Sequence, residues 1–126
     1  MEKKLIYELH ADHREWANKM EFYNDEIRVM RRRLSDVAAK NSAKDIQALV
    51  EHFENQLIVQ KEQCDILKHT IREYDKVIEA HLNNNDVAAD KTRWNDHAHL
   101  RDKVETFERI FNDLRKELIA FLSRWM

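Results

Sequence analysis

The sequence predicts an all-α protein, folded as an elongated up-down-up antiparallel bundle of three helices. Two observations lead to this fold class. The 126 residues include no glycine and no proline, the residues that most tight turns and sharp helix stops require. Apolar residues also recur at alternating steps of three and four in three long runs, which is the heptad pattern of helices packed side by side. A chain with few turns and three such runs suits a helical bundle better than a β sandwich or an α/β fold.

The first run predicts a helix from about residue 3 to residue 40. Its seam is apolar except at His13. The heptad phase is lost at Asn41 and Ser42, short polar residues that can end one helix and cap the next. Ser42 followed by Asp45 forms a weak capping-box pattern for the second helix. We therefore expect the first turn at these residues.

The second run predicts a helix from about residue 43 to residue 82, and the third run predicts one from about residue 87 to residue 125. Between them, residues 83–86 read NNND, and the heptad phase changes there again. Gln60 lies on the seam of the second run, where its neighbours are apolar. A buried polar residue at such a position can fix the register of packed helices, so we assign that role to Gln60.

Short connections leave only antiparallel neighbours, so the helices should form a single domain over residues 1–126. The heptad spacing also predicts left-handed coiled-coil packing. The expected outline is similar to that of a spectrin repeat in shape only, because no family motif is present. One alternative stays open. Since neither Gly nor Pro interrupts the chain at Asn41, the first two helices could instead form one long helix in an extended coiled-coil dimer.

The charge balance suggests few partners. Lys and Arg total 22 against 24 Asp and Glu, a formal charge of -2, so we expect neither nucleic acid nor a membrane as a partner. The basic stretch Arg28–Arg33 points in several directions around a helix and is expected to be a solvated face. No secretion signal is recognisable, and no apolar run approaches the ~20 residues of a membrane span. The single cysteine, Cys64, suits a reducing compartment, so we expect a cytoplasmic location.

Four histidines are candidate metal ligands. Antiparallel packing should bring them toward one end of the bundle; they are His10, His13, His81 and His97. Imidazoles that converge inside a bundle can bind Zn or Fe, but the Glu-x-x-His pairs of ferritin-like sites are absent from the chain. A histidine on a helical seam is more often a hydrogen-bonded polar residue. We therefore expect no cofactor, and we keep metal binding by these histidines as the alternative function.

Apolar residues outside the seams carry the main functional expectation. They lie on outward positions near the middle of the first two helices and are Phe22, Val29, Ile58, Val59 and Ile66. A contiguous apolar set on a charged rod suggests burial against another chain. No catalytic motif accompanies this set, since the lack of glycine excludes phosphate-binding loops and Cys64 has no histidine at its level. We expect a non-enzymatic interaction or scaffold protein that forms a homodimer or binds another helical protein.

Overall fold

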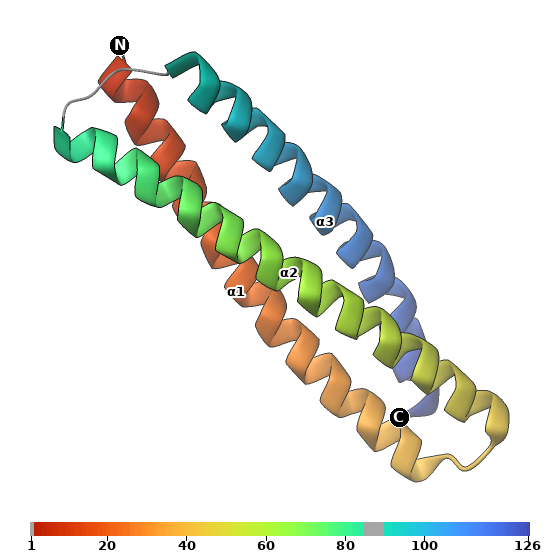
Figure 1. Ribbon diagram of the computed structural model, residues 1–126. Coiled ribbons are helices and arrows are strands. Elements are labelled where there is room, and N and C mark those ends of the chain that lie inside the picture. Colours follow the sequence, from red (N-terminus) through yellow and green to blue (C-terminus); the bar gives the residue numbers. More distant parts are fainter. Residues whose placement is uncertain (1, 85–89) are drawn as a thin grey trace.

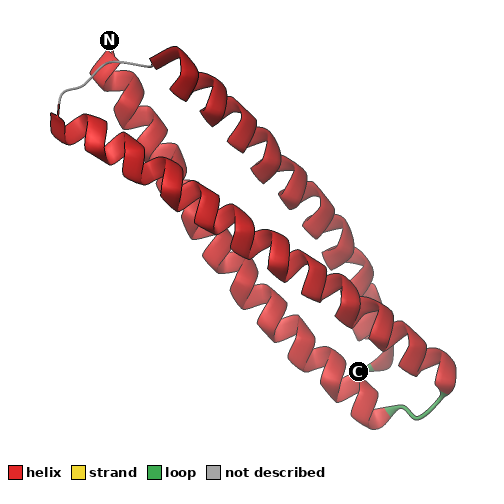
Figure 2. Cartoon of the chain, viewed as in Figure 1, coloured by secondary structure: helices red, strands yellow, loops and turns green. Residues whose placement is uncertain are grey.

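The computed structural model confirms the predicted fold class. It describes the backbone of residues 2–84 and 90–126, and the side chains of residues 6–80 and 96–126. Nearly all of this backbone lies in three helices, α1 (Glu2–Lys40), α2 (Lys44–Asn84) and α3 (Asp90–Trp125). They run up, down and up along an elongated bundle (Figure 1), and within the described ranges no strand is present (Figure 2). None of the described helices holds a stretch long and apolar enough to cross a bilayer.

The helix boundaries agree with the predicted ones to within a few residues. The cap position of α2 falls on Ala43 and not on Ser42, because the backbone N–H of Gln47 donates to the Ala43 carbonyl at 3.0 Å. The expected capping box is therefore wrong. At its other end α2 extends to Asn84, two residues beyond the predicted stop. Residues 85–89, which include the predicted start of the third helix at residue 87, lie outside the described residues.

The first turn excludes one continuous helix through residues 1–82, because the chain reverses there (Figure 1). The backbone N–H and the side-chain amide of Asn41 both donate to the Val37 carbonyl, at 3.1 and 2.9 Å. The same side chain donates to the Trp125 carbonyl at 3.3 Å, which joins the turn to the end of α3. The amide group of Gln47 reaches back across the turn to the carbonyls of Ala38 and Asn41. Side-chain amides thus supply the bonds that a glycine-containing turn would make through its backbone.

The predicted seams form the core. All ten seam positions of the first run are buried, as are almost all the described positions of the other two. Val50, Tyr74 and Trp125 are half-buried and pack against the edge of this core. Each fully buried apolar side chain contributes roughly 1.5–3 kcal/mol, so the three seams account for why these long, highly charged helices associate.

Aromatic residues determine how closely the helices pack. Tyr23 of α1 contacts Phe107 and Phe111 of α3, with ring centroids 5.5 and 4.9 Å apart, and Phe53 of α2 contacts Phe121 of α3 at 5.1 Å. The α1–α2 seam carries fewer rings, and these two helices approach each other more closely than either approaches α3. Large side chains therefore hold α3 further from the other two helices.

Candidate functional site

Two of the predicted histidines meet one carboxylate between α1 and α2. His10 and His13 are one helical turn apart, and their Nδ1 atoms lie 2.8 and 3.1 Å from the same Asp75 oxygen. The antiparallel reversal at the first turn places Asp75 of α2 at this height. Asp75 is half-buried, and it holds the two imidazoles against the edge of the bundle.

A third predicted histidine extends this contact across the core. His97 of α3 lies with its Nδ1 atom 3.4 Å from Nε2 of His13, and with its Nε2 atom 3.0 Å from Oδ2 of Asp12. The imidazole of His97 also stacks on the indole of Trp16, with ring centroids 4.9 Å apart. Asp75, His13, His97 and Asp12 therefore form one polar chain that links all three helices.

This polar chain divides the hydrophobic core. The main cluster of buried apolar residues begins at Trp16 and continues toward the first turn. A smaller cluster lies on the other side of the histidines, near the amino terminus, and consists of Ile6, Leu9 and Ile78. Among the described side chains, the apolar cluster beyond the histidines is thus much smaller than the main one.

Burial lowers the pKa of both interior histidines. For His13 the loss of hydration is the largest cause, opposed by its hydrogen bond to Asp75. For His97 desolvation again comes first, the nearby His13 lowers the pKa further, and the hydrogen bond to Asp12 opposes both. The two imidazoles therefore favour the neutral form inside the bundle.

When both imidazoles are neutral, the chain has two N–H donors for three contacts, those of Asp75 with His13, His13 with His97, and His97 with Asp12. These two donors can serve the contact of Asp75 with His13 and that of His13 with His97. Arg101 then donates toward both Nε2 of His97 and Oδ2 of Asp12, at 3.3 and 3.4 Å. Protonation of His97 would place a further hydrogen between His97 and Asp12. Burial of the charge costs more than this bond contributes, because desolvation is the largest cause of the lowered pKa of His97.

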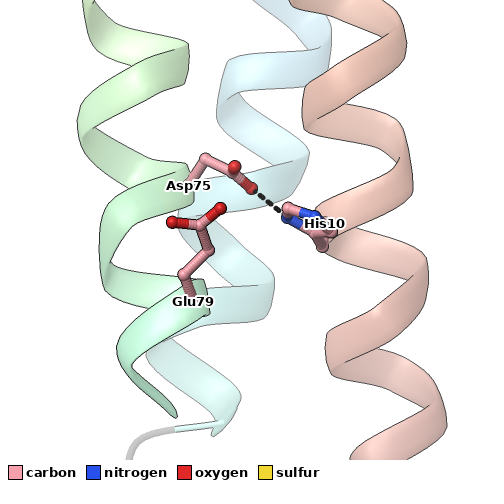
Figure 3. A group of neighbouring side chains, drawn as sticks. All are labelled: His10, Asp75 and Glu79. Atoms are coloured by element: carbon pink, nitrogen blue, oxygen red, sulfur yellow. Dashed lines mark hydrogen bonds and ion pairs between the residues drawn. The ribbon is translucent and has the colours of Figure 1, made fainter. Parts of the chain in front are cut away.

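A second group of ligand-type atoms lies at the outer end of this chain. His10, Asp75 and Glu79 each offer one such atom, and these atoms all lie within 4.8 Å of one another (Figure 3). A groove of about 220 Å³ beside them, between α1 and α2, is lined by Asp75, Glu79 and His13 among others. The group is thus open to solvent on one side.

The structure brings together three of the four histidines predicted as metal ligands. These are His10, His13 and His97; the side chain of His81 lies outside the described residues. Metal binding by this set stays a prediction. Sequence reasoning missed Asp75 and Glu79 as members of the cluster. Two acids one helical turn apart are visible in the sequence, but which residue of α2 stands opposite His10 follows only from the axial offset between the helices.

The predicted interface residues of α1 face the α3 side of the bundle. Phe22 lies three residues after Lys19 and four before Glu26, and both of these form ion pairs with α3. Val29 follows Phe22 by one heptad and shares its side of the helix. Both side chains are exposed.

The predicted interface residues of α2 are also exposed, but they do not share one side. Glu54 marks the side toward α1, because it pairs with Arg31 at 2.6 Å. Successive residues of a helix turn by about 100°, so Ile58 lies about 40° from Glu54. Val59 and Ile66 lie about 140° and 120° from it and are turned away from α1. The five residues are therefore distributed around the bundle and do not form one patch.

An uncharged stripe on α2 was missed at the level of sequence. It follows Val59 and Ile66 along the helix at steps of three and four, parallel to the buried seam. Its members are Leu49, His52, Gln56, Val59, Gln63, Ile66 and Thr70. All are exposed or half-buried. None of them is Asp, Glu, Lys or Arg, although these four residue types make up 37% of the chain. We call this set the α2 stripe.

One residue of α3 adds to this side of the bundle. Ile110 is 46% exposed and lies two residues after Glu108, which pairs with α1, so Ile110 points away from α1. Asn24 of α1 contacts Asp65 of α2 at 3.2 Å, and it lies five residues after Lys19, which pairs with Glu108 of α3. Ile110 therefore lies at about the height of Ile66.

Gln60, which was predicted on the seam of α2, is buried, and so is Cys64 one turn further along the helix. The Sγ atom of Cys64 donates to the Met20 carbonyl at 3.2 Å, and burial raises the pKa of this thiol to about 11. Cys64 therefore stays protonated and is a poor nucleophile at neutral pH. Gln60 is 6% exposed, and its role in fixing the register remains a prediction.

The arginine stretch borders a long open groove. This groove has a volume of about 1210 Å³ and lies between α1 and the first half of α2. Arg28, Arg31 and Arg32 line it together with Glu51 and Glu54, so its charge is mixed. A mixed wall of this kind provides no continuous basic surface for a nucleic-acid backbone.

Comparison of the chain with protein-family models, curated proteins and solved structures finds no match. Proposals about function therefore depend on the chain's own residues.

Proposed function

We propose that this chain is a non-enzymatic helical interaction protein that self-associates through the α2 stripe. The observation that supports the proposal is the stripe itself. Val59 and Ile66 are 51% and 58% exposed, and the side chains before and after them on the same side of the helix are uncharged. A solvated helix face in so charged a chain would normally carry several charged residues, as the exposed positions Asp25, Arg32 and Asp36 of α1 do.

The periodicity of the α2 stripe favours a helix as its partner. Steps of three and four place its members in a narrow row along α2, which is the shape that a second helix packs against. A second copy of α2 in antiparallel orientation supplies the same uncharged row. A twofold axis near Gln63 would place Val59 of one copy beside Ile66 of the other, and this pairing is self-complementary.

The expected affinity is modest. Covering the exposed half of an aliphatic side chain contributes about 1 kcal/mol. Each of Val59, Ile66 and Ile110 occurs twice in a twofold dimer, so their burial contributes about 6 kcal/mol in total. Association costs at least about 4 kcal/mol in lost translational and rotational freedom. The remaining about 2 kcal/mol corresponds to a dissociation constant of tens of millimolar. We therefore expect a weak dimer that forms only at high protein concentration and dissociates on dilution.

Sedimentation equilibrium on two double variants tests the proposal. Val59→Glu with Ile66→Glu buries two carboxylates in the pairing row and should leave a monomer at concentrations where the wild type is dimeric. Phe22→Glu with Val29→Glu makes the same charge change on the α3 side of α1 and should remain dimeric. Loss of the dimer only in this second variant would assign self-association to α1 and contradict the α2 stripe.

A control and a geometric test complete the experiment. Asn18→Glu with Asn112→Glu places the same two charges on exposed polar positions and should leave the dimer intact. Gln63→Cys should form a disulfide-linked dimer under mild oxidation, because a residue at the twofold axis meets its own copy. The proposal is overturned if the average sedimenting mass of the wild type does not rise with concentration up to about 1 millimolar, where about 5 per cent of the chains should be dimeric.

A further inference from the structure

We propose that His10, Asp75 and Glu79 bind a divalent transition-metal ion of the Zn²⁺ type, with water completing its coordination. The group lies at the end of the bundle near the amino terminus, on the edge between α1 and α2. Asp75 lies about 13 Å along α2 from Ile66, at ~1.5 Å per residue, and on the side toward α1, whereas Val59 and Ile66 are turned away from α1. The metal site and the self-association surface can therefore be tested independently.

The geometry of the group suits one small ion. Asp75 and Glu79 are one helical turn apart, so both carboxylates leave α2 on the side toward α1. In Figure 3 the two carboxylates and the imidazole of His10 converge on the same space. His10 Nδ1 already lies 2.8 Å from Asp75 Oδ1, and a tetrahedral ion with bonds of about 2.0–2.2 Å requires ligand atoms about 3.3 Å apart. A small opening of this contact would admit the ion.

The carboxylates are not neutralised by nearby cations. Three cationic residues line the groove. Lys76 pairs with Glu73 at 3.2 Å, and Arg72 pairs with Glu21 at 3.5 Å. The described side chain of Arg14 forms no ion pair with Asp75 or Glu79. Among the described side chains, the ion pairs of Asp75 are with histidines alone, and Glu79 forms none. A divalent cation would therefore meet two carboxylates whose charge has no Lys or Arg partner.

The donor set indicates the class of ion. Imidazole nitrogen with carboxylate oxygen suits Zn²⁺ and its first-row neighbours, whereas Ca²⁺ and Mg²⁺ prefer oxygen alone. Three protein ligands next to an open groove leave at least one position for water. His13 is within hydrogen-bonding distance of the same Asp75 oxygen, at 3.1 Å, and in this way orients a ligating carboxylate.

Isothermal titration of tag-free, chelator-treated protein with Zn²⁺ tests the inference. We expect one Zn²⁺ per chain in the wild type. His10→Ala with Glu79→Gln should weaken binding by at least about tenfold, because it removes two of the three ligands. Circular dichroism should show unchanged helix content in this variant, since both residues lie at the surface or half-buried.

The chain offers a matched control. His69 and Glu73 are exposed on the outer side of α2, four residues apart, and provide the same two residue types outside the group. His69→Ala with Glu73→Gln should bind Zn²⁺ as the wild type does. The inference is overturned if the wild type takes up no Zn²⁺ at 100 micromolar (an affinity too weak to be specific), or if the His10 and Glu79 variant keeps wild-type stoichiometry and affinity. It is also overturned if binding is lost equally in the His69 and Glu73 variant.

Discussion

His13 and His97 meet inside the bundle, with Nε2 of the first 3.4 Å from Nδ1 of the second. Both side chains are almost completely buried, at 3% and 2% exposure, on a layer that otherwise would be apolar. A contact between two imidazoles requires that one of the facing nitrogens lack a proton. The two histidines therefore cannot both be doubly protonated here. Burial also lowers the pKa of each, so the stability of this end of the bundle should depend on pH.

The protein should lose stability as the pH falls below neutrality. The pKa of His97 is lowered in the folded state, chiefly by burial, so the unfolded chain takes up this proton at a higher pH than the folded chain does. Between about pH 6.5, where an exposed histidine titrates, and the lower folded pKa, protonation favours unfolding. Urea unfolding in the presence of a chelator should give a lower midpoint at pH 5.5 than at pH 7.5.

A variant shows whether His97 causes this loss. Asp12 and His13 face the imidazole from α1, and Arg101 lies beside it on α3. His97→Gln removes the titrating group and should reduce the difference between the two midpoints. His99→Gln changes an exposed histidine two residues away and should preserve it. An equal midpoint at both pH values in the wild type would contradict the prediction.

Cys64 should react with alkylating agents only when the chain unfolds. The thiol is buried, contacts the carbonyl and the sulfur of Met20, and has its pKa raised to about 11 by burial. At pH 8 the folded protein therefore presents almost no thiolate. Mass spectrometry after iodoacetamide treatment should show unmodified native protein and complete modification in 8 M urea, about the concentration that unfolds most domains. Rapid modification of the native protein would show that the seam opens at Cys64.

Heptad spacing was sufficient to predict the fold because the packing of long helices is largely encoded in which residues are apolar. The seam positions read from the sequence are buried with few exceptions, and the phase changes mark where the helices end. The same spacing placed His13 and His97 in the interior. Local periodicity fixes the direction of each side chain on its own helix, and short turns fix how the helices pair.

Contacts between helices were harder to predict. Which residue of α2 stands opposite His10 depends on an axial offset of a few ångström, which residue spacing within one helix does not set. Asp75 and Glu79 were missed for that reason. The five outward apolar residues were assigned to one patch because their height along the bundle was considered without the angle around each helix. The ion pair of Glu54 with Arg31 supplies the missing angle.

Replacing Gln60 with leucine should stabilise the monomeric fold. The Gln60 side chain is buried on the seam, and burying an amide costs free energy that a leucine of similar size does not incur. We expect the free energy of unfolding to rise by about 1 kcal/mol, measured by urea denaturation. If Gln60 fixes the register, the variant should also populate more than one packing, seen as broadened amide signals in an NMR spectrum. A loss of stability would show instead that the amide makes bonds on which the fold depends.

Asn41 should contribute more to stability than its position in a turn suggests. Its side chain donates to the carbonyl of Val37 and to that of Trp125, so it closes α1 and holds the end of α3. Each such bond contributes about 0.5–1.5 kcal/mol, and Asn41→Ala should therefore lower the free energy of unfolding by about 1–2 kcal/mol. Ser42 is exposed, and it is not the cap of α2, because Ala43 occupies that position. Ser42→Ala should therefore lower the free energy of unfolding by less than about 0.5 kcal/mol. If the two variants are equally stable, the link from Asn41 to Trp125 does not hold α3 in solution. In that case the carboxyl-terminal turn of α3 should also exchange its amide hydrogens as fast as an unprotected helix end.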